Sequence, residues 1–418
     1  MHRRSIVIAA FSTVVEWYDF TLYLYFSTVL ARVFFGGGST SLAATLGGFA
    51  VAYLMRPVGA VVFGHIGDRR GRRPMLLLSM AVMSGAMLLT ALLPTDAQIG
   101  PLAAWLLILL RCVMGFSVGG EYTGVVAYLL ESAPDSRRGL IASLAAAASE
   151  VGALLAVAVS ALTVSAMSNT DLESWGWRIP FLVGAALAGL VWVARSTMNE
   201  SPDFERQRTE GTIPRNPLHH ALSEQRRGVM RGFAISALGS ITYYVGINYV
   251  PAFLSSVGSS TEAEALWLST IAAVAVILVT PVIGHLSDRA GRKPILLILT
   301  GLSVLLPVLM FSLMASAATG TVLLAAVTMA LIAGAVSAVG AVATAEQFRG
   351  EARITGLALG ATTATAIFGG LTPYLAQLLI DGTGRPEVPG LMISVVALCV
   401  SPVFLLMRET RPSPAQRR

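Results

Sequence analysis

The chain has 418 residues, of which 55% are hydrophobic and only 12% are charged, about half the charged share of an average soluble domain. This composition excludes an ordinary soluble protein, and twelve membrane spans of roughly 20 residues each would use up the chain and leave no room for a soluble catalytic domain. The formal net charge of +6 does not indicate nucleic-acid binding, because the basic residues fall in short clusters between apolar runs.

Twelve apolar runs follow one another, and we predict a membrane-spanning helix at each. Their centres lie near Tyr18, Ala52, Leu88, Leu110, Ala153 and Ala188, and then near Tyr243, Ala275, Leu305, Ala333, Thr365 and Val396. A polar stretch rich in proline, arginine and glutamate separates the two sets. We therefore predict an all-α membrane protein with six-helix bundles at residues 1–197 and 229–418, joined by a cytoplasmic linker at residues 198–228.

Basic residues mark every second loop, from Arg3 and Arg4 to the final segment 408–418. Loops rich in arginine and lysine remain in the cytoplasm, so we predict that both termini are cytoplasmic. Lys293 is the one lysine among the 29 lysine and arginine residues, a bias that we attribute to a GC-rich bacterial genome. The predicted location is the inner membrane of a bacterial cell, with the chain as a multi-pass monomer.

One loop motif occurs twice, as GHIGDRRGRR at residues 64–73 and as GHLSDRAGRK at residues 284–293. A duplicated unit in one orientation indicates two parallel repeats, between which access to a central site can alternate. The glycines allow close helix packing, and the acidic and basic residues can pair and cap helix ends. Topology signals alone would not need this repeated spacing. We predict a gate formed by Gly64, Asp68, Arg72, Asp288 and Arg292.

The segment 64–73 resembles the signature loop of the major facilitator superfamily. Other motifs look like those of its metabolite:proton symporter family, namely residues 16–20, 55–57, 111–122, 131–139, 175–181, 346–348, 353–356 and 368–373. This resemblance covers nearly the whole chain and implies the twelve-helix major facilitator fold. It also implies transport of small polar metabolites such as 2-oxoglutarate, citrate, shikimate, proline or betaine, generally with a proton. The chain departs from the family at residues 361–364 and at Glu150.

Four ionisable side chains are predicted to lie at one level of the first bundle. At 1.5 Å per residue, Glu16 and Asp19 lie roughly 15 to 20 Å from the cytoplasmic start of the first helix, and Arg111 and Glu150 reach a similar depth on the fourth and fifth. Ionisable residues within a membrane are costly and are by default functional. Three carboxylates exceed one guanidinium, so at least one of them is expected to bind a proton part of the time.

We predict that Arg111 binds a substrate carboxylate through its planar guanidinium group. Glu16, Asp19 and Glu150 are the candidates for proton coupling. Arg56 and Glu121 lie nearer the cytoplasm, and for them a structural role is as plausible as a functional one. The second bundle has no ionisable side chain in mid-helix, so its predicted substrate contacts are polar residues. Together with Tyr18 of the first bundle, these are Tyr243, Asn248, Tyr249, Thr362 and Thr363.

The sequence thus favours a secondary transporter that couples uptake of a small mono- or dicarboxylate to a proton, without metal or cofactor. A zwitterion such as proline or betaine is an alternative, since acidic residues outnumber Arg111 at its level and residues 115–124 resemble proline/betaine transporters. An exporter on the same scaffold is another. A membrane sensor would need an output domain larger than the linker, and no nucleophile or metal constellation indicates an intramembrane enzyme.

Overall fold

The computed structural model describes residues 3–37, 41–134, 137–212, 223, 225–250, 253–254, 257, 262–316, 318–348 and 353–411. The elements in these residues are all helical, which confirms the predicted all-α class. Contacts divide the chain into two compact units. Unit 1 comprises Met1–Tyr128 and Ala148–Pro217, and unit 2 comprises Leu129–Ala147 and Leu218–Arg418. The domain boundaries predicted from the sequence differ from these units in the segment Leu129–Ala147 and stay a prediction.

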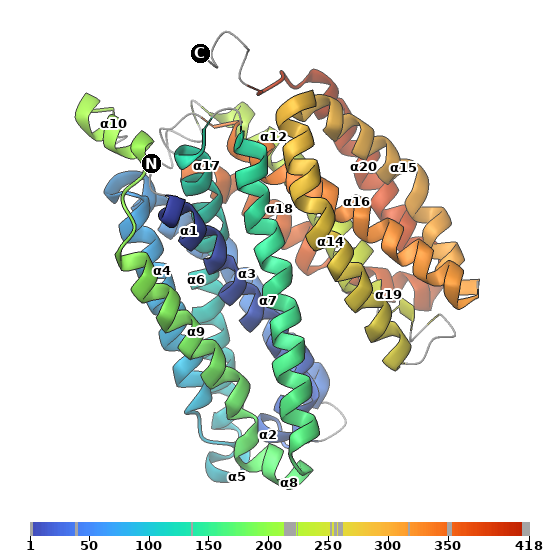
Figure 1. Cartoon of the computed structure of the whole chain (residues 1–418). Coiled ribbons are helices and arrows are strands. Elements are labelled where there is room, and N and C mark those ends of the chain that lie inside the picture. The colour runs from blue at the N-terminus through green and yellow to red at the C-terminus, as the bar shows by residue number, and fades with distance from the viewer. Residues whose placement is uncertain are drawn as a thin grey trace. The chain divides into compact units, whose positions relative to one another are not determined.

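Unit 1 is built from long helices with short helices at one end (Figure 1). The long helices are α1 (Arg3–Tyr25), α3 (Ser41–Arg70), α4 (Arg72–Ala91), α6 (Leu102–Ser132), α7 (Arg138–Ala166) and α9 (Arg178–Ser196). The end of α6 and the start of α7 belong to unit 2. The short elements are α2 (Ser27–Phe34), α5 (Asp96–Ile99), α8 (Asn169–Asp171) and the π-helix η2 (Leu172–Gly176). The helix α10 (Pro202–Glu210) lies at the opposite end, near the start of α1.

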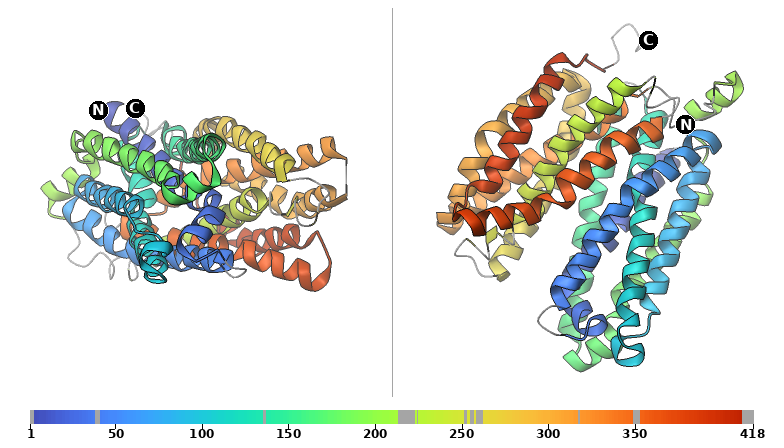
Figure 2. Two further views of the ribbon diagram at one scale, coloured as in Figure 1. Left: turned by 90° about the horizontal axis from the view of Figure 1, so that it is seen from below. Right: turned by 180° about the vertical axis from the view of Figure 1, so that it is seen from behind.

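Unit 2 contains several helices that change from α to π geometry along their length. Its elements are α12 (Arg226–Tyr243), η3 (Tyr244–Asn248), α14 (Glu262–Ala290), α15 (Arg292–Ser316), α16 (Thr319–Ala345), α17 (Arg353–Leu357), η4 (Ala358–Thr362), α18 (Thr363–Thr365), η5 (Ala366–Gly370), α19 (Thr372–Thr383) and α20 (Val388–Leu406). Helices α15 and α20 pack side by side (Figure 2). Short π-helical segments within α-helices are frequent at functional sites.

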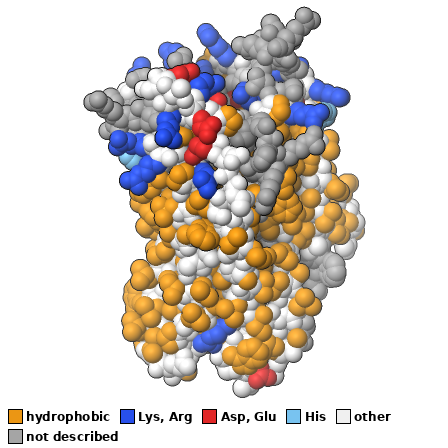
Figure 3. Space-filling view, turned by 60° about the vertical axis from the view of Figure 1, so that its left-hand side comes forward, with side chains coloured by type: hydrophobic (Ala, Val, Ile, Leu, Met, Phe, Trp, Pro, Cys, Tyr) orange, Lys and Arg blue, Asp and Glu red, His pale blue; other side chains and the backbone are white. Residues whose placement is uncertain are grey.

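Eight helical segments in the described part of the chain have the length and apolar composition to cross a membrane. They are Arg72–Ala91, Leu102–Glu131, Arg138–Ser160, Leu172–Ser196, Thr270–Ala290, Arg292–Ala315, Thr319–Ala345 and Val388–Leu406. The predicted count of twelve spans and the cytoplasmic termini stay predictions. On the face drawn in Figure 3, hydrophobic side chains cover the middle, and lysine and arginine gather towards one end. This is the charge distribution that the positive-inside rule predicts for a multi-pass membrane protein.

The core of unit 1 combines aromatic, methionine and aliphatic side chains, many of them from α1, α4 and α9. Tyr18 of α1 is fully buried, and its hydroxyl donates to the carbonyl oxygen of Pro180 at 2.9 Å. The ring of Trp177 lies edge-on to Phe34, with 4.9 Å between centroids. The Tyr18 contact fixes α1 against α9, and the Trp177 contact joins α2 to the residue that precedes α9. They therefore hold the charged side chains of α1 at a defined depth.

Candidate functional site

Two glycines of α6 bring its backbone into contact with that of α3. A Cβ atom on Gly115 would lie 2.0 Å from the carbonyl oxygen of Ala52, and one on Gly119 would lie 2.0 Å from that of Arg56. Gly115 and Gly119 are about one helical turn apart, which is the spacing typical of closely packed membrane helices. Arg111 lies one turn before Gly115 on α6. The close contact of α6 with α3 places Arg111 and Arg56 beside one pocket.

We expect the substitution Gly115→Ala to destabilise the protein by about 1 to 3 kcal/mol, because the added methyl group overlaps a backbone oxygen and forces α3 and α6 apart. The thermal unfolding midpoint of the purified protein measures this loss. Gly85→Ala on α4 is the matched control, since nothing lies within 4 Å of a Cβ atom at that position. Equal midpoints for the two variants would show that the close contact is unimportant.

A pocket in unit 1 collects charged residues from three helices. Its empty volume is about 370 Å³, part of it open to solvent. The charged and aromatic residues that line it are Glu16, Asp19, Arg56, Arg111, Phe20, Tyr23 and Tyr53. Of the four residues that the depth count placed at one level, Glu16, Asp19 and Arg111 line the pocket and Glu150 does not. Arg56, which was predicted to lie nearer the cytoplasm, also reaches the pocket. A pocket lined by charged and aromatic side chains suits a small polar solute.

Arg111 and Asp19 form a buried ion pair within the pocket. Arg111 Nη1 lies 2.8 Å from Asp19 Oδ2, and both side chains are at most 4% exposed. Arg111 Nη2 donates to Thr90 Oγ1 at 3.1 Å. The guanidinium carbon lies 5.5 Å from the ring centroid of Tyr23 and 5.7 Å from that of Phe181. Both terminal nitrogens of Arg111 thus have hydrogen-bond partners. A substrate carboxylate can bind Arg111 only after the contact with Asp19 is broken.

Three polar atoms of the pocket residues have no hydrogen-bond partner among the described residues. They are Glu16 Oε2, Asp19 Oδ1 and Arg111 Nε. A buried polar group without a partner costs about 1 to 3 kcal/mol, and buried groups of this kind call for an explanation such as a ligand or an ion. The pocket therefore offers two acceptor oxygens and one donor to a bound solute.

Arg56 lies between two aromatic rings at the pocket. Its guanidinium carbon is 4.8 Å from the ring centroid of Phe20 and 4.5 Å from that of Tyr53. Such cation–π contacts stabilise a cation in a poorly solvated site by about 1 to 2 kcal/mol. The sequence left the role of Arg56 open, and this position makes it a second cation next to the acidic residues.

A second buried ion pair joins Glu121 of α6 to Arg195 of α9. Both side chains are at most 1% exposed. Ser79 donates to Glu121 at 2.6 Å, and Arg195 also donates to the carbonyl oxygen of Leu76 at 2.8 Å and to Ser12. The network links α1, α4, α6 and α9, which supports the structural interpretation of Glu121. Arg195 was not among the predicted site residues, because a basic residue in the last turn of an apolar helix looks like a topology signal.

Other predicted site residues lie outside the pocket lining. Glu150 of α7 is buried, with 3% of its surface exposed. Tyr18 packs between α1 and α9, and Gly184 provides the space beneath its ring. The predicted substrate contacts of the second bundle are in unit 2, at Tyr243, Asn248, Tyr249, Thr362 and Thr363. They lie in or next to η3 and η4, and their role in binding stays a prediction.

The two copies of the repeated motif have the same local structure. A single glycine separates α3 from α4 and α14 from α15, with φ of +109° at Gly71 and +105° at Gly291. A residue with a side chain rarely adopts such an angle, which explains why the motif has glycine there. Arg72 pairs with Asp68 at 3.1 Å, and Arg292 pairs with Asp288 at 3.0 Å. The predicted charge pairs of the motif are thus present in both halves.

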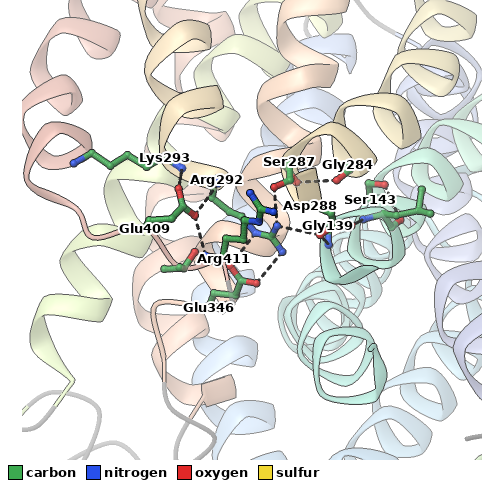
Figure 4. A network of polar contacts seen from close by, with 12 residues as sticks. Gly139, Ser143, Gly284, Ser287, Asp288, Arg292, Lys293, Glu346, Glu409 and Arg411 are labelled. Atoms are coloured by element: carbon green, nitrogen blue, oxygen red, sulfur yellow. Dashed lines mark hydrogen bonds and ion pairs between the residues drawn. The ribbon is translucent and has the colours of Figure 1, made fainter. Parts of the chain in front are cut away.

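In unit 2 the motif also holds the start of α7 (Figure 4). Asp288 accepts hydrogen bonds from the backbone nitrogens of Gly139 at 2.8 Å and Leu140 at 3.0 Å. An acidic side chain at a helix N-terminus satisfies unpaired N–H groups and interacts favourably with the helix dipole. Arg292 bridges Asp288 to Glu346, which lies 3.0 Å away at the end of α16. The gating role of these residues stays a prediction.

Glu200, which follows α9, and Glu409, which follows α20, each cap the helix that begins after a motif glycine. Glu200 accepts from the backbone nitrogen of Arg72 at 2.9 Å, and Glu409 accepts from that of Arg292 at 2.9 Å. Burial raises the pKa of Glu409, but the N–H donors of Arg411, Arg292 and Lys293 outweigh it and lower the pKa below 4.5. Ionised Glu409 therefore stabilises the fold.

We expect Glu409→Gln to reduce thermal stability at neutral pH and to have little effect in acid. The pKa of Glu409 is lower in the folded than in the unfolded chain, so its contribution is fully present above pH 4.5 and is lost as the pH falls through the folded-state value. Unfolding midpoints of both proteins between pH 3.5 and about 7 measure the effect. A gap that stays constant across this range would contradict the proposed cap.

Comparisons with known proteins agree with these features. The family model for sugar and other transporters matches residues 5–212, and that for the major facilitator superfamily matches residues 237–418. An ectoine/proline transporter of Corynebacterium glutamicum is 34% identical over 415 residues, covering 96% of this chain and 82% of that protein. A citrate-proton symporter of Klebsiella pneumoniae is 30% identical over 387 residues, covering 92% and 87%. The solved structure of the proton:xylose symporter XylE has a TM-score of 0.81 at 20% identity, over 98% of this chain and 96% of that one, which shows a shared fold.

Proposed function

The chain belongs to the major facilitator superfamily and is a proton-coupled transporter rather than an enzyme, and we propose that it carries a small zwitterion with a carboxylate group. The observation behind this proposal is the buried Arg111–Asp19 pair at 2.8 Å, set beside an acidic residue with an unpartnered oxygen. A proton on Asp19 would neutralise the partner of Arg111. The guanidinium could then bind the carboxylate of the solute.

Glu16 favours a zwitterion over a simple organic acid. Its Oε2 atom has no hydrogen-bond partner among the described residues, and the rings of Phe20 and Tyr53 line the same pocket. A carboxylate and aromatic rings together suit an ammonium or quaternary ammonium group. The ectoine/proline relative supports this class. The prediction from the sequence put an organic acid first, because the guanidinium of Arg111 can bind a carboxylate through two hydrogen bonds.

A small organic acid is the second candidate, and Arg56 favours it. The pocket contains two guanidinium groups, Arg56 and Arg111, which could bind two carboxylates of one solute. The citrate-proton relative agrees with this alternative. The bacterial sources of both relatives support an inner-membrane location.

Uptake into proteoliposomes tests the proposal. With an acidic exterior, we expect the protein to accumulate proline or glycine betaine above the external concentration, and a protonophore to abolish this accumulation. Citrate and 2-oxoglutarate serve as the competing substrates under the same gradient. Accumulation of these acids alone would reject the zwitterion, and uptake that is indifferent to the gradient would reject proton coupling by this pocket.

A further inference from the structure

We infer that Thr90 of α4 is a positioning residue that holds the guanidinium of Arg111 in place while Asp19 carries a proton. This inference rests on the proposed function, in which protonation of Asp19 releases Arg111 for the solute. Among the described residues, Asp19 and Thr90 are the side chains that accept hydrogen bonds from Arg111. Protonation of Asp19 changes the charge of one of these acceptors, whereas the hydrogen bond from Arg111 to Thr90 is unaffected.

The hydroxyl of Thr90 has a fixed direction. The side chain is fully buried, and its Oγ1 donates to the carbonyl oxygen of Ala86, one turn earlier on α4, at 2.7 Å. This bond uses the one hydroxyl hydrogen, so the oxygen presents only lone pairs to Arg111 and accepts from Nη2 at 3.1 Å. A threonine hydroxyl does not titrate near neutral pH. The contact is therefore independent of the proton that moves on and off Asp19.

Two aromatic rings lie near the same guanidinium group but do not prevent it from rotating within its own plane. The rings of Tyr23 and Phe181 lie 5.5 and 5.7 Å from its central carbon. The hydroxyl of Tyr23 donates to the carbonyl oxygen of Thr45 at 3.0 Å, so this ring is itself anchored. Such rings attract a cation without a preferred in-plane direction. The hydrogen bond to Thr90 supplies that direction.

Glu16 explains why a positioning residue is needed. It is a second carboxylate on α1, lines the same pocket and has an unpartnered oxygen. A guanidinium released from Asp19 and held only by rings would be attracted to this carboxylate. Arg111 would then be lost as the partner of the solute. The bond to Thr90 keeps Nη2 on α4, so that Nη1, which contacts Asp19 in this structure, stays where the solute carboxylate would bind.

The substitution Thr90→Val tests this role, because valine has nearly the same shape and lacks the hydroxyl group. With radiolabelled proline as the probe in proteoliposomes, we expect the KM to rise about tenfold, as for loss of one hydrogen bond to a charged group, while the maximal rate changes less than about twofold. Thr90→Ser retains the acceptor and should keep the KM within about twofold of that of the unmodified protein. An unchanged KM in Thr90→Val, or a Thr90→Ser variant as impaired as Thr90→Val, would overturn the inference.

A measurement that needs no transport separates this inference from the proposed function. Each of the variants Asp19→Asn and Thr90→Val alters one of the two partners of Arg111, and the double variant alters both. We expect the double variant to lose more thermal stability than the sum of the two single losses, since the anchors act on one guanidinium. Additive losses would overturn the role of Thr90. Failure of the unmodified protein to accumulate proline or glycine betaine would instead overturn the proposed function, while the unfolding cycle would still decide on Thr90.

Discussion

The substitution Asp19→Asn is expected to abolish solute accumulation driven by a proton gradient and to preserve solute exchange. Asparagine resembles the protonated acid in shape and charge. Arg111 therefore loses the ionised partner that lies 2.8 Å away in the unmodified protein. The guanidinium is then permanently available to a solute carboxylate. Without a group that gains and loses a proton at this position, the gradient can no longer drive net movement. We expect accumulation to fall at least about tenfold, to near the equilibrium level.

Counterflow exchange and gradient-driven uptake, measured side by side in proteoliposomes, distinguish this result from misfolding. A variant that exchanges solute is folded, so retained exchange with lost accumulation identifies a coupling defect. Glu173→Gln is the matched control, because Glu173 belongs to an exposed ion pair with Arg32 and should leave both assays unchanged. Normal accumulation in Asp19→Asn would show that another carboxylate, Glu16 or Glu150, carries the proton.

The positions of the main pocket residues could be predicted from the sequence because helices in a membrane have a fixed rise per residue. Counting residues from the helix ends placed Glu16, Asp19, Arg111 and Glu150 at one level, and the first three line one pocket, whereas Glu150 is not in its lining. The repeat of the motif glycines Gly71 and Gly291 is visible in the sequence, but their positive φ angles are seen only in the structure. The depth of a residue along a helix and the repeat of a motif can both be read from residue spacing.

The direction in which each side chain points could not be predicted from the same counts. Tyr18 follows Trp17 and precedes Asp19, yet its hydroxyl lies against Pro180 on α9 rather than in the pocket. Thr90 has no sequence signal, because hydroxyl residues are common in membrane helices and often bond to their own backbone. The contact of Asp288 with Gly139 joins residues 149 positions apart. Such contacts depend on helix rotation and packing.

The substitution Glu121→Leu is expected to destabilise the protein by about 3 to 5 kcal/mol, the usual cost of removing one partner from a buried ion pair. Arg195 would remain fully buried with its positive charge uncompensated. Its remaining partners, the carbonyl oxygen of Leu76 and the hydroxyl of Ser12, are neutral. The loss appears as a lower thermal unfolding midpoint of the purified protein.

The double variant Glu121→Leu with Arg195→Met shows whether the cost comes from the unpaired charge. Replacing both members of a buried pair by apolar residues removes the uncompensated charge and is often neutral or stabilising, so we expect the midpoint to recover most of the loss. Glu173→Gln, which breaks the exposed pair with Arg32, should cost no more than about 1 kcal/mol. If the double variant were as unstable as Glu121→Leu, the unpaired charge would not be the cause of the lost stability. The loss would then come from the packing of the Glu121 side chain between α4 and α9. Recovery of stability without recovery of uptake would show that the Glu121–Arg195 pair also serves transport, beyond holding α1, α4, α6 and α9 together.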